Sequence, residues 1–181
     1  MDAALSTLRK KYGKVRIVQP VLPVVDFPPV SGRRKGEVAM AIRRPDDTIL
    51  LQTKEFYPVG TFRLPTGGIK DGEDVEHALL REVHEESNLS VEIEQLVAAI
   101  DYLAPDGRAT FRTYLFLLRE TGGELKVNDP KERISGWEQR DPAGLLRAAE
   151  ELRAIDEGWQ RWGHFRALVL DILHDALTAR P

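Results

Sequence analysis

Cysteine is absent from this chain of 181 residues. Disulfides, zinc–thiolate sites and cysteine nucleophiles are therefore excluded, and the absence is consistent with a reducing compartment. Apolar runs of the roughly 20 residues that a membrane helix needs are also missing. The first segment, MDAALSTLRKKYGK, lacks the apolar stretch of a secretory signal. We therefore expect a cytoplasmic protein with no membrane association.

An excess of positive charge is missing as well, because the formal net charge is −3. This balance argues against a general nucleic-acid-binding role. The one small basic cluster, Arg9, Lys10, Lys11 and Lys14, is interpreted as a solvated face. The remaining composition, 42% hydrophobic and 30% charged, is typical of a soluble globular domain. An acidic protein that acts on a polyanion would need a metal ion or a local basic pocket.

Hydrophobic periodicity predicts an alternation of strands and helices. The expected elements are a proline-rich extended arm (15–31), strands (36–44, 48–56, 60–69), a helix (about 75–87), strands (89–103, 109–120) and two helices after residue 142. This order predicts a mixed α/β sandwich, with helices packed on a largely non-parallel sheet. We expect three parts: an N-terminal arm (1–35), a main domain (36–150) and a C-terminal helix (151–181).

Residues 67–89, GGIKDGEDVEHALLREVHEESNL, place three carboxylates within five residues, directly after a glycine-rich turn. On a helix, Glu82, Glu85 and Glu86 lie within one sector of about 100°. A solvated helix face is one interpretation. A divalent-metal site on an exposed helix face is the other, because clustered carboxylate oxygens suit magnesium or manganese.

The spacing of this segment distinguishes the two interpretations. Gly67 is followed, after five residues, by Glu73 and, after seven more, by a run from Arg81 to Leu89 that reads REVHEESNL. Eight of nine defined positions match the signature of the Nudix hydrolases, which the segment therefore resembles. The departure is Asn88, where the family has glycine, and asparagine tolerates the left-handed conformation expected there. With RLPTGGIKDGED and the flanking strands, the resemblance covers about residues 36–150.

The resemblance implies a fold, a chemistry and a metal. The fold is the α/β/α sandwich of the Nudix hydrolases, with a mixed sheet. The chemistry is hydrolysis of a nucleoside diphosphate linked to another moiety, with Mg²⁺ as cofactor and Mn²⁺ as a substitute. The metal ligands would be Glu82, Glu85 and Glu86, with the carbonyl of Gly67 as a further ligand. His84, between the carboxylates, is expected to face solvent or pack.

Two further roles follow from the resemblance. Arg81 and Glu73 would pair and brace the loop against the helix. Two residues are candidates for the base that activates water: Glu82, inside the motif, and Glu132, in the later segment NDPKERISGW. Glu138 is a weaker choice for this role.

Two features resemble ADP-ribose pyrophosphatases. Pro105 follows the motif by sixteen residues, and LLQTKEFYPVG is similar to a segment of those enzymes, with Phe56 and Tyr57 as candidate base-stacking residues. The acidic residue often found after that proline is missing from APDGRATF. ADP-ribose or a nucleotide sugar is the preferred substrate, and a (d)NTP or a dinucleoside polyphosphate is the alternative. A non-catalytic nucleotide sensor is the alternative of another class, although all four motif glutamates are present.

The C-terminal segment carries an apolar stripe at helical spacing. Its residues are Trp159, Trp162, Phe165, Val169, Ile172 and Leu173. The pattern leaves two roles equally open, packing inside the domain or forming the interface of a homodimer.

Overall fold

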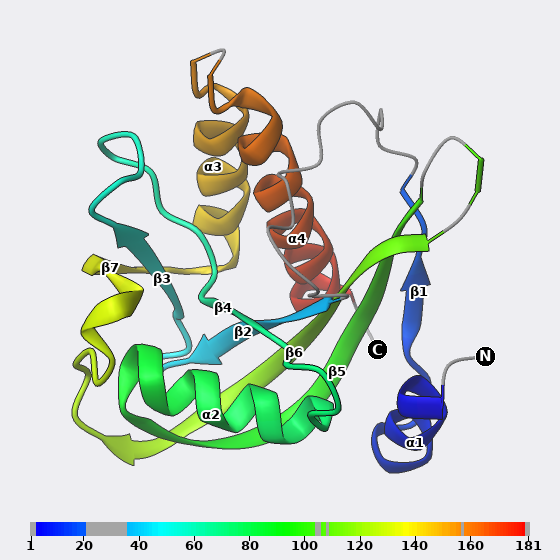
Figure 1. The fold of residues 1–181 in the computed structure, drawn as a ribbon. Helices are drawn as coiled ribbons and strands as arrows, with labels where there is room; N and C mark the ends of the chain where they lie inside the picture. The colour runs from blue at the N-terminus through cyan, green and yellow to red at the C-terminus, as the bar shows by residue number, and fades with distance from the viewer. Residues whose placement is uncertain (1–2, 21–35, 104–105, 108, 157, 180–181) are drawn as a thin grey trace.

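The computed structural model describes residues 3–20, 36–103, 106–107, 109–156 and 158–179 (Figure 1). The helices are α1 (Ala3–Tyr12), α2 (Val75–Ser87), α3 (Pro142–Arg153) and α4 (Gln160–Thr178), with a 3₁₀ helix η2 (Pro130–Glu132). The strands are β1 (Arg16–Val18), β2 (Gly36–Arg43), β3 (Ile49–Lys54), β4 (Thr66–Gly68), β5 (Leu89–Leu103), β6 (Ala109–Gly123) and β7 (Ile134–Arg140). Pro105 and most of the predicted proline-rich arm lie outside the described residues.

The strands form one mixed sheet in the order β1-β5-β6-β2-β3-β7, with β4 paired to β2. The pairs β1–β5 and β2–β6 are parallel, and the others are antiparallel. Helix α2 lies on one face of the sheet, and α3 and α4 lie on the other (Figure 1). The predicted α/β sandwich with a mixed sheet is confirmed.

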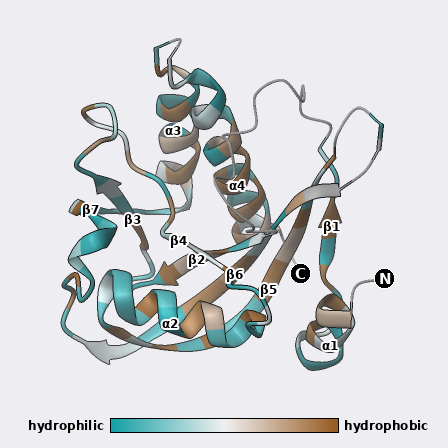
Figure 2. Cartoon of the chain, viewed as in Figure 1, coloured by the Kyte–Doolittle hydropathy of each residue, from teal (hydrophilic) through white to brown (hydrophobic). Residues whose placement is uncertain are grey.

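Strand β2 shows why the sheet needs helices on both faces. Val38, Met40 and Ile42 belong to a core shared with α1 and α2, whereas Ala39 and Ala41 belong to a core shared with α3 and α4. Successive side chains of a strand point to opposite faces, so a strand covered on both sides is apolar throughout. In Figure 2 the apolar part of β2 has the brown colour of hydrophobic residues, as expected for a buried strand.

The stripe of α4 is used inside the fold. Its members Phe165, Val169, Ile172 and Leu173 are buried in the core with α3 and the sheet, and Trp162 packs against that core. The two helices approach closely at Gly163, where a Cβ atom would stand 2.0 Å from the carbonyl oxygen of Leu152. Intramolecular packing therefore accounts for these five residues of the stripe, whereas Trp159 lines a surface hollow.

Several predicted elements are confirmed, and two were not predicted. The hairpin of β2 and β3 turns at PDD, and α2 and β5 have the expected bounds. Of the strand expected over residues 60–69, the residues Thr66–Gly68 form β4. Helix α1 was not predicted, because residues 1–35 were interpreted as an extended arm, and β7 was not assigned. Among the described residues, no helix is long and apolar enough to cross a membrane.

Candidate active site

Helix α2 carries the acidic motif, and local side chains define its ends. The Asp74 carboxylate accepts hydrogen bonds from the backbone N–H groups of Glu76 and His77, at 2.9 and 3.2 Å. These groups would otherwise lack partners at the helix start. At the other end Asn88 adopts φ 56°, and its N–H donates to the carbonyl of His84. Asparagine thus takes the left-handed conformation that the sequence predicts at this position.

Arg81 joins the helix to the glycine-rich loop before it. Its Nε and Nη2 donate to the two carboxylate oxygens of Glu73, at 2.7 and 2.8 Å, and Nη2 also donates to the carbonyl of Gly68. Its Nη1 donates to Glu82 at 2.7 Å and to Glu85 at 3.0 Å. Hydrogen bonds from Arg81 lower the pKa of Glu73 to about 2. Arg81 and Glu73 therefore form the expected pair, and the same guanidinium also positions Glu82.

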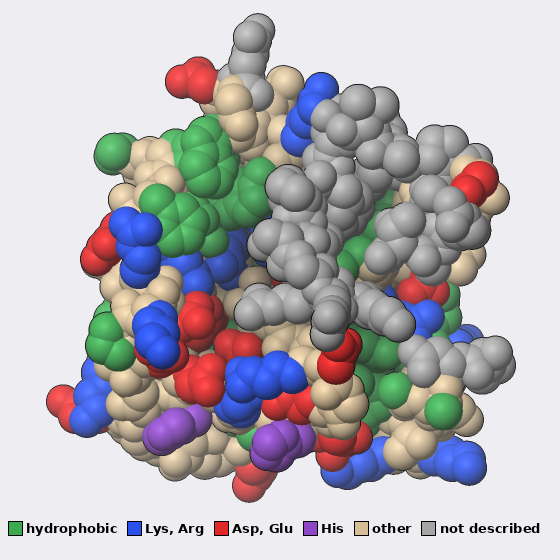
Figure 3. All heavy atoms as spheres, viewed as in Figure 1, with side chains coloured by type: hydrophobic (Ala, Val, Ile, Leu, Met, Phe, Trp, Pro, Cys, Tyr) green, Lys and Arg blue, Asp and Glu red, His purple; other side chains and the backbone are tan. Residues whose placement is uncertain are grey.

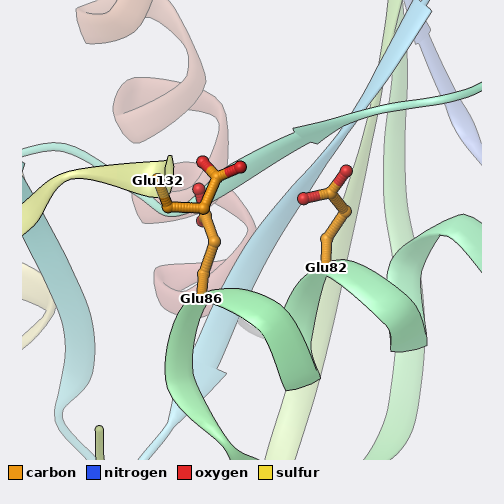
Figure 4. A group of neighbouring side chains, drawn as sticks. All are labelled: Glu82, Glu86 and Glu132. Carbon is orange, nitrogen blue, oxygen red and sulfur yellow. The ribbon is translucent and has the colours of Figure 1, made fainter. Parts of the chain in front are cut away.

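Three carboxylates meet beside this helix. Glu82 and Glu86 come from α2 and Glu132 from η2, and one oxygen of each lies within 4.8 Å of the others. Figure 4 shows Glu86 and Glu132 side by side, with Glu82 one turn away along the helix. Glu82 is 6% exposed and Glu86 is 0% exposed. The prediction of an exposed acidic helix face is therefore wrong for these two residues.

The loop that supplies Glu132 is docked on the end of α2. The backbone N–H groups of Asn128 and Asp129 donate to the carbonyl of Glu85, at 3.0 and 3.1 Å. The side-chain amide of Asn128 donates to the carbonyl of His84 at 2.9 Å. The last carbonyls of a helix lack partners within it, and the loop supplies donors to that of Glu85 and a second donor to that of His84. Capping of α2 by the loop thus fixes the position of Glu132.

Two polar residues of β3 reach the same carboxylates. Gln52 donates from Nε2 to one oxygen of Glu86 at 3.0 Å, and Lys54 donates from Nζ to the other at 3.1 Å. Lys54 also donates to Glu132 at 2.6 Å. Both residues are buried. The sequence interpretation passed over them, although their two-residue spacing in TILLQTK indicates that both face the same side of the strand.

The three carboxyl groups titrate differently. Burial raises the pKa of Glu86 to about 7, although the charges of Lys54 and Arg63 oppose the shift. Burial also raises the pKa of Glu82, against the hydrogen bond from Arg81. Burial alone would raise the pKa of Glu132, but the hydrogen bond and charge of Lys54 outweigh it and lower that pKa. Neighbouring carboxyls with opposite shifts are typical of sites that bind cations or move protons.

Gly67 lies directly against Glu82. A Cβ atom at position 67 would stand 1.9 Å from Cγ and Cδ of Glu82, so any side chain there would displace the carboxylate. The residue pairs with Val38 where β4 joins β2. Close packing against Glu82 therefore requires glycine at this position, and coordination by its carbonyl stays a prediction.

Three other residues considered from the sequence lie outside the group formed by Glu82, Glu86 and Glu132. Glu85 points to Arg81, and its role as a metal ligand stays a prediction. Glu138 pairs with Arg140 at 2.6 Å on β7. His84 is exposed, as expected.

Phe56 and Tyr57 lie in the loop after β3 but differ in their surroundings. Phe56 is 47% exposed, and the guanidinium of Arg133 lies over its ring, 5.1 Å from the ring centre. The ring of Tyr57 is 4.6 Å from that of Trp162, and its hydroxyl accepts hydrogen bonds from Nε and Nη2 of the buried Arg63. Phe56 is therefore the more exposed of the two aromatic residues, and Tyr57 is held within the fold.

A hollow of about 690 Å³ adjoins these two rings. It lies between the loop after β3 and the α3–α4 connection, and its lining includes Phe56, Tyr57, Trp159 and Asp156. Figure 3 shows hydrophobic side chains gathered above a band of acidic and basic ones on the same face. An aromatic hollow beside a charged site can accommodate a ligand with a flat ring and an anionic part.

Comparison with known proteins agrees with this geometry. A family model described as the NUDIX domain matches residues 33–162, which is more than half of the chain. The chain belongs to the Nudix hydrolase family. As a member, it is a pyrophosphohydrolase, and enzymes of this family generally use divalent metals.

Individual relatives differ in what they act on. The chain is 32% identical over 118 residues to an ADP-ribose pyrophosphatase of Methanocaldococcus jannaschii, covering 65% of this chain and 68% of that protein. It is 30% identical over 126 residues to the 8-oxo-dGDP phosphatase NUDT18 of Mus musculus, covering 67% of this chain and 37% of the relative. A crystal structure of an ADP-ribose pyrophosphatase from Streptococcus suis has a TM-score of 0.54 at 22% identity, covering 82% of this chain and 96% of that one. The structural similarity supports the fold.

Proposed function

We propose that this Nudix enzyme is a Mg²⁺-dependent pyrophosphohydrolase that cleaves ADP-ribose or a similar nucleotide sugar into a nucleoside monophosphate and a sugar phosphate. The observation that carries the proposal is the convergence of Glu82, Glu86 and Glu132, with Arg133, the residue after Glu132, lying over the ring of the exposed Phe56. Similarity to the archaeal ADP-ribose pyrophosphatase supports the substrate class.

The donor set fits a hard divalent cation. Glu82, Glu86 and Glu132 offer carboxylate oxygens within 4.8 Å of one another, and Arg81 holds Glu82 in place. Glu82 and Glu86 would bind the metal, with Glu85 and the Gly67 carbonyl as the other predicted ligands. A bound Mg²⁺ or Mn²⁺ would neutralise charge on the diphosphate and acidify a coordinated water.

Glu132 is our choice for the base that activates water. It comes from a loop separate from the helix, and its side chain is 27% exposed, so solvent can reach it. The side chain of Glu82 is only 8% exposed. Each carboxylate has one oxygen bound by a cation, Arg81 for Glu82 and Lys54 for Glu132, so the difference between them is exposure. A base must contact the water from which it takes a proton, which favours the more accessible carboxylate.

Phe56 would stack on the nucleobase, with Tyr57 beside it. Its exposed ring lies two residues beyond Lys54, which contacts the acidic residues Glu86 and Glu132. A ligand could therefore place its base on Phe56 while its diphosphate reaches the carboxylates. A predicted contribution from Pro105 is kept as part of the proposal.

A competition assay tests the substrate. Purified protein is given ADP-ribose, a nucleoside triphosphate, 8-oxo-dGDP and a dinucleoside polyphosphate at equal Mg²⁺, and kcat/KM values are compared. We expect ADP-ribose to be preferred. A preference of more than about tenfold for another substrate, about 1.4 kcal/mol in transition-state binding, would overturn the ADP-ribose assignment but leave pyrophosphohydrolase activity standing. Similarity to NUDT18, named as an 8-oxo-dGDP phosphatase, adds a nucleoside diphosphate to the alternatives expected from the sequence, a (d)NTP or a dinucleoside polyphosphate.

A cytoplasmic location and a homodimer are also kept as proposals. Because the α4 stripe is used inside the fold, a dimer would need another surface. Cell fractionation and analytical ultracentrifugation test the two expectations, and a monomer at micromolar concentration would refute the second.

A further inference from the structure

The ammonium group of Lys54 lies among the carboxylates that would bind a metal. It donates to Glu86 at 3.1 Å and to Glu132 at 2.6 Å, and its side chain is 9% exposed. Gln52 holds the second oxygen of Glu86. The cation therefore bridges a helix residue and a loop residue that meet only through tertiary structure.

We propose that Lys54 is a tethered counter-ion of the metal-free site, and that a divalent cation binds by displacing its ammonium from Glu86 and Glu132. The inference deepens the proposed function and rests on its metal assignment. In this exchange the lysine keeps the two carboxylates together until the metal replaces it. Gln52 stays on Glu86 throughout and preserves the orientation of that carboxylate.

The charges around Lys54 favour replacement of its ammonium by the metal ion over binding of both cations to the carboxylates at once. The groups that face it are Glu86 and Glu132, with Glu82 in the same cluster and the buried guanidinium of Arg63 nearby. A divalent ion on these carboxylates would lie within a few ångströms of the ammonium, where like charges repel strongly in a poorly solvated site. Arg63 is enclosed by its own hydrogen bonds, whereas Lys54 is on a flexible stem. Lys54 is therefore the cation that can move away.

The exchange predicts that Lys54 weakens metal affinity in the absence of substrate. Lys54→Met keeps most of the aliphatic stem and removes the charge, so a metal no longer has to displace an ammonium. We expect Lys54→Met to bind Mn²⁺ at least about tenfold more tightly than the wild type, whereas Lys54→Arg, which keeps the charge, should bind within about threefold of it. Equal or weaker binding by Lys54→Met would overturn the proposal.

The measurement is titration of the substrate-free protein with Mn²⁺, with free Mn²⁺ determined by electron paramagnetic resonance. Lys131→Gln is the matched control, because it removes one exposed lysine charge next to Glu132 without touching the cluster, and we expect it to bind like the wild type. If Lys131→Gln increased the Mn²⁺ affinity as much as Lys54→Met, the effect would be one of net charge, and the exchange would be refuted. Circular dichroism and thermal melting verify folding. If Lys54→Met is unfolded, Lys54→Gln gives the same test with a neutral donor left for Glu132.

Failure of this inference can be told apart from failure of the proposed function. Binding of equal affinity in wild type and Lys54→Met would refute the exchange while leaving the metal site intact. If neither protein binds Mn²⁺, the metal assignment is wrong and the exchange falls with it. Glu86→Gln in the same titration identifies the site, because it should abolish the tight binding in both backgrounds.

Discussion

Replacing Arg81 by alanine removes a side chain that makes five hydrogen bonds in the site. The substitution leaves Glu73 and Glu82, whose side chains are each 8% exposed, without their cationic partner. Removing one member of a buried ion pair typically costs about 3–5 kcal/mol. Because Arg81 is itself 16% exposed, we expect the lower end, a loss of about 3 kcal/mol in the free energy of unfolding.

The pH dependence separates the Glu73 pair from the other contacts. The pKa of Glu73 is about 2 in the folded protein and ordinarily about 4.5. Because the folded value is depressed, its contribution is fully present above about pH 4.5 and is lost as the pH falls through about 2. A shift of this size corresponds to about 3 kcal/mol, which solvent screening reduces to about 1–2 kcal/mol.

Urea denaturation of the wild type, Arg81→Ala, Glu73→Gln and the double variant measures this pair as a mutant cycle. We expect a coupling energy of about 1–2 kcal/mol at pH 7 and a smaller one near pH 2.5. Arg119→Ala is the control, because Arg119 is 51% exposed and its ion pairs should contribute less than about 0.5 kcal/mol. Additivity at pH 7 within about 0.3 kcal/mol would refute the pairing.

Three further substitutions test the site. Glu86→Gln should lower kcat at least about 100-fold without unfolding the protein, and a near wild-type rate at saturating Mg²⁺ would exclude Glu86 as a ligand. Glu132→Gln should lower kcat more than Mn²⁺ affinity; if it is fully active while Glu82→Gln is inactive with metal bound, the base is Glu82. Phe56→Ala should raise KM for ADP-ribose about tenfold through loss of about 1.4 kcal/mol of stacking, with Phe56→Trp as the control, and an unchanged KM would place the base elsewhere.

Local sequence patterns were sufficient to predict many of the helices, strands and turns. The β2–β3 hairpin, the bounds of α2 and the left-handed Asn88 all follow from neighbouring residues, because caps, turns and periodicity act over a few positions. Helix α1 was missed because its apolar face is small, with Leu5 and Leu8 as the buried residues. Strand β7, ISGWEQR, was missed because its residues are mostly polar or half-buried. Pairing with β3 establishes this strand, and that contact is not visible in its own sequence.

The sequence by itself indicated the chemical class, because residues 67–89 resemble the Nudix signature and helical spacing puts Glu82, Glu85 and Glu86 within one sector of the helix. Tertiary structure decided which charges share a site. Glu132 joins Glu82 and Glu86 through a loop docked on the C-terminus of α2, and Lys54 enters from a strand. Lys54 and Glu132 are each more than thirty positions from Glu86. Burial raises the pKa of Glu86, whereas the hydrogen bond and charge of Lys54 outweigh burial and lower the pKa of Glu132. Contacts at such separations depend on how the sheet and helices pack, which no local pattern encodes.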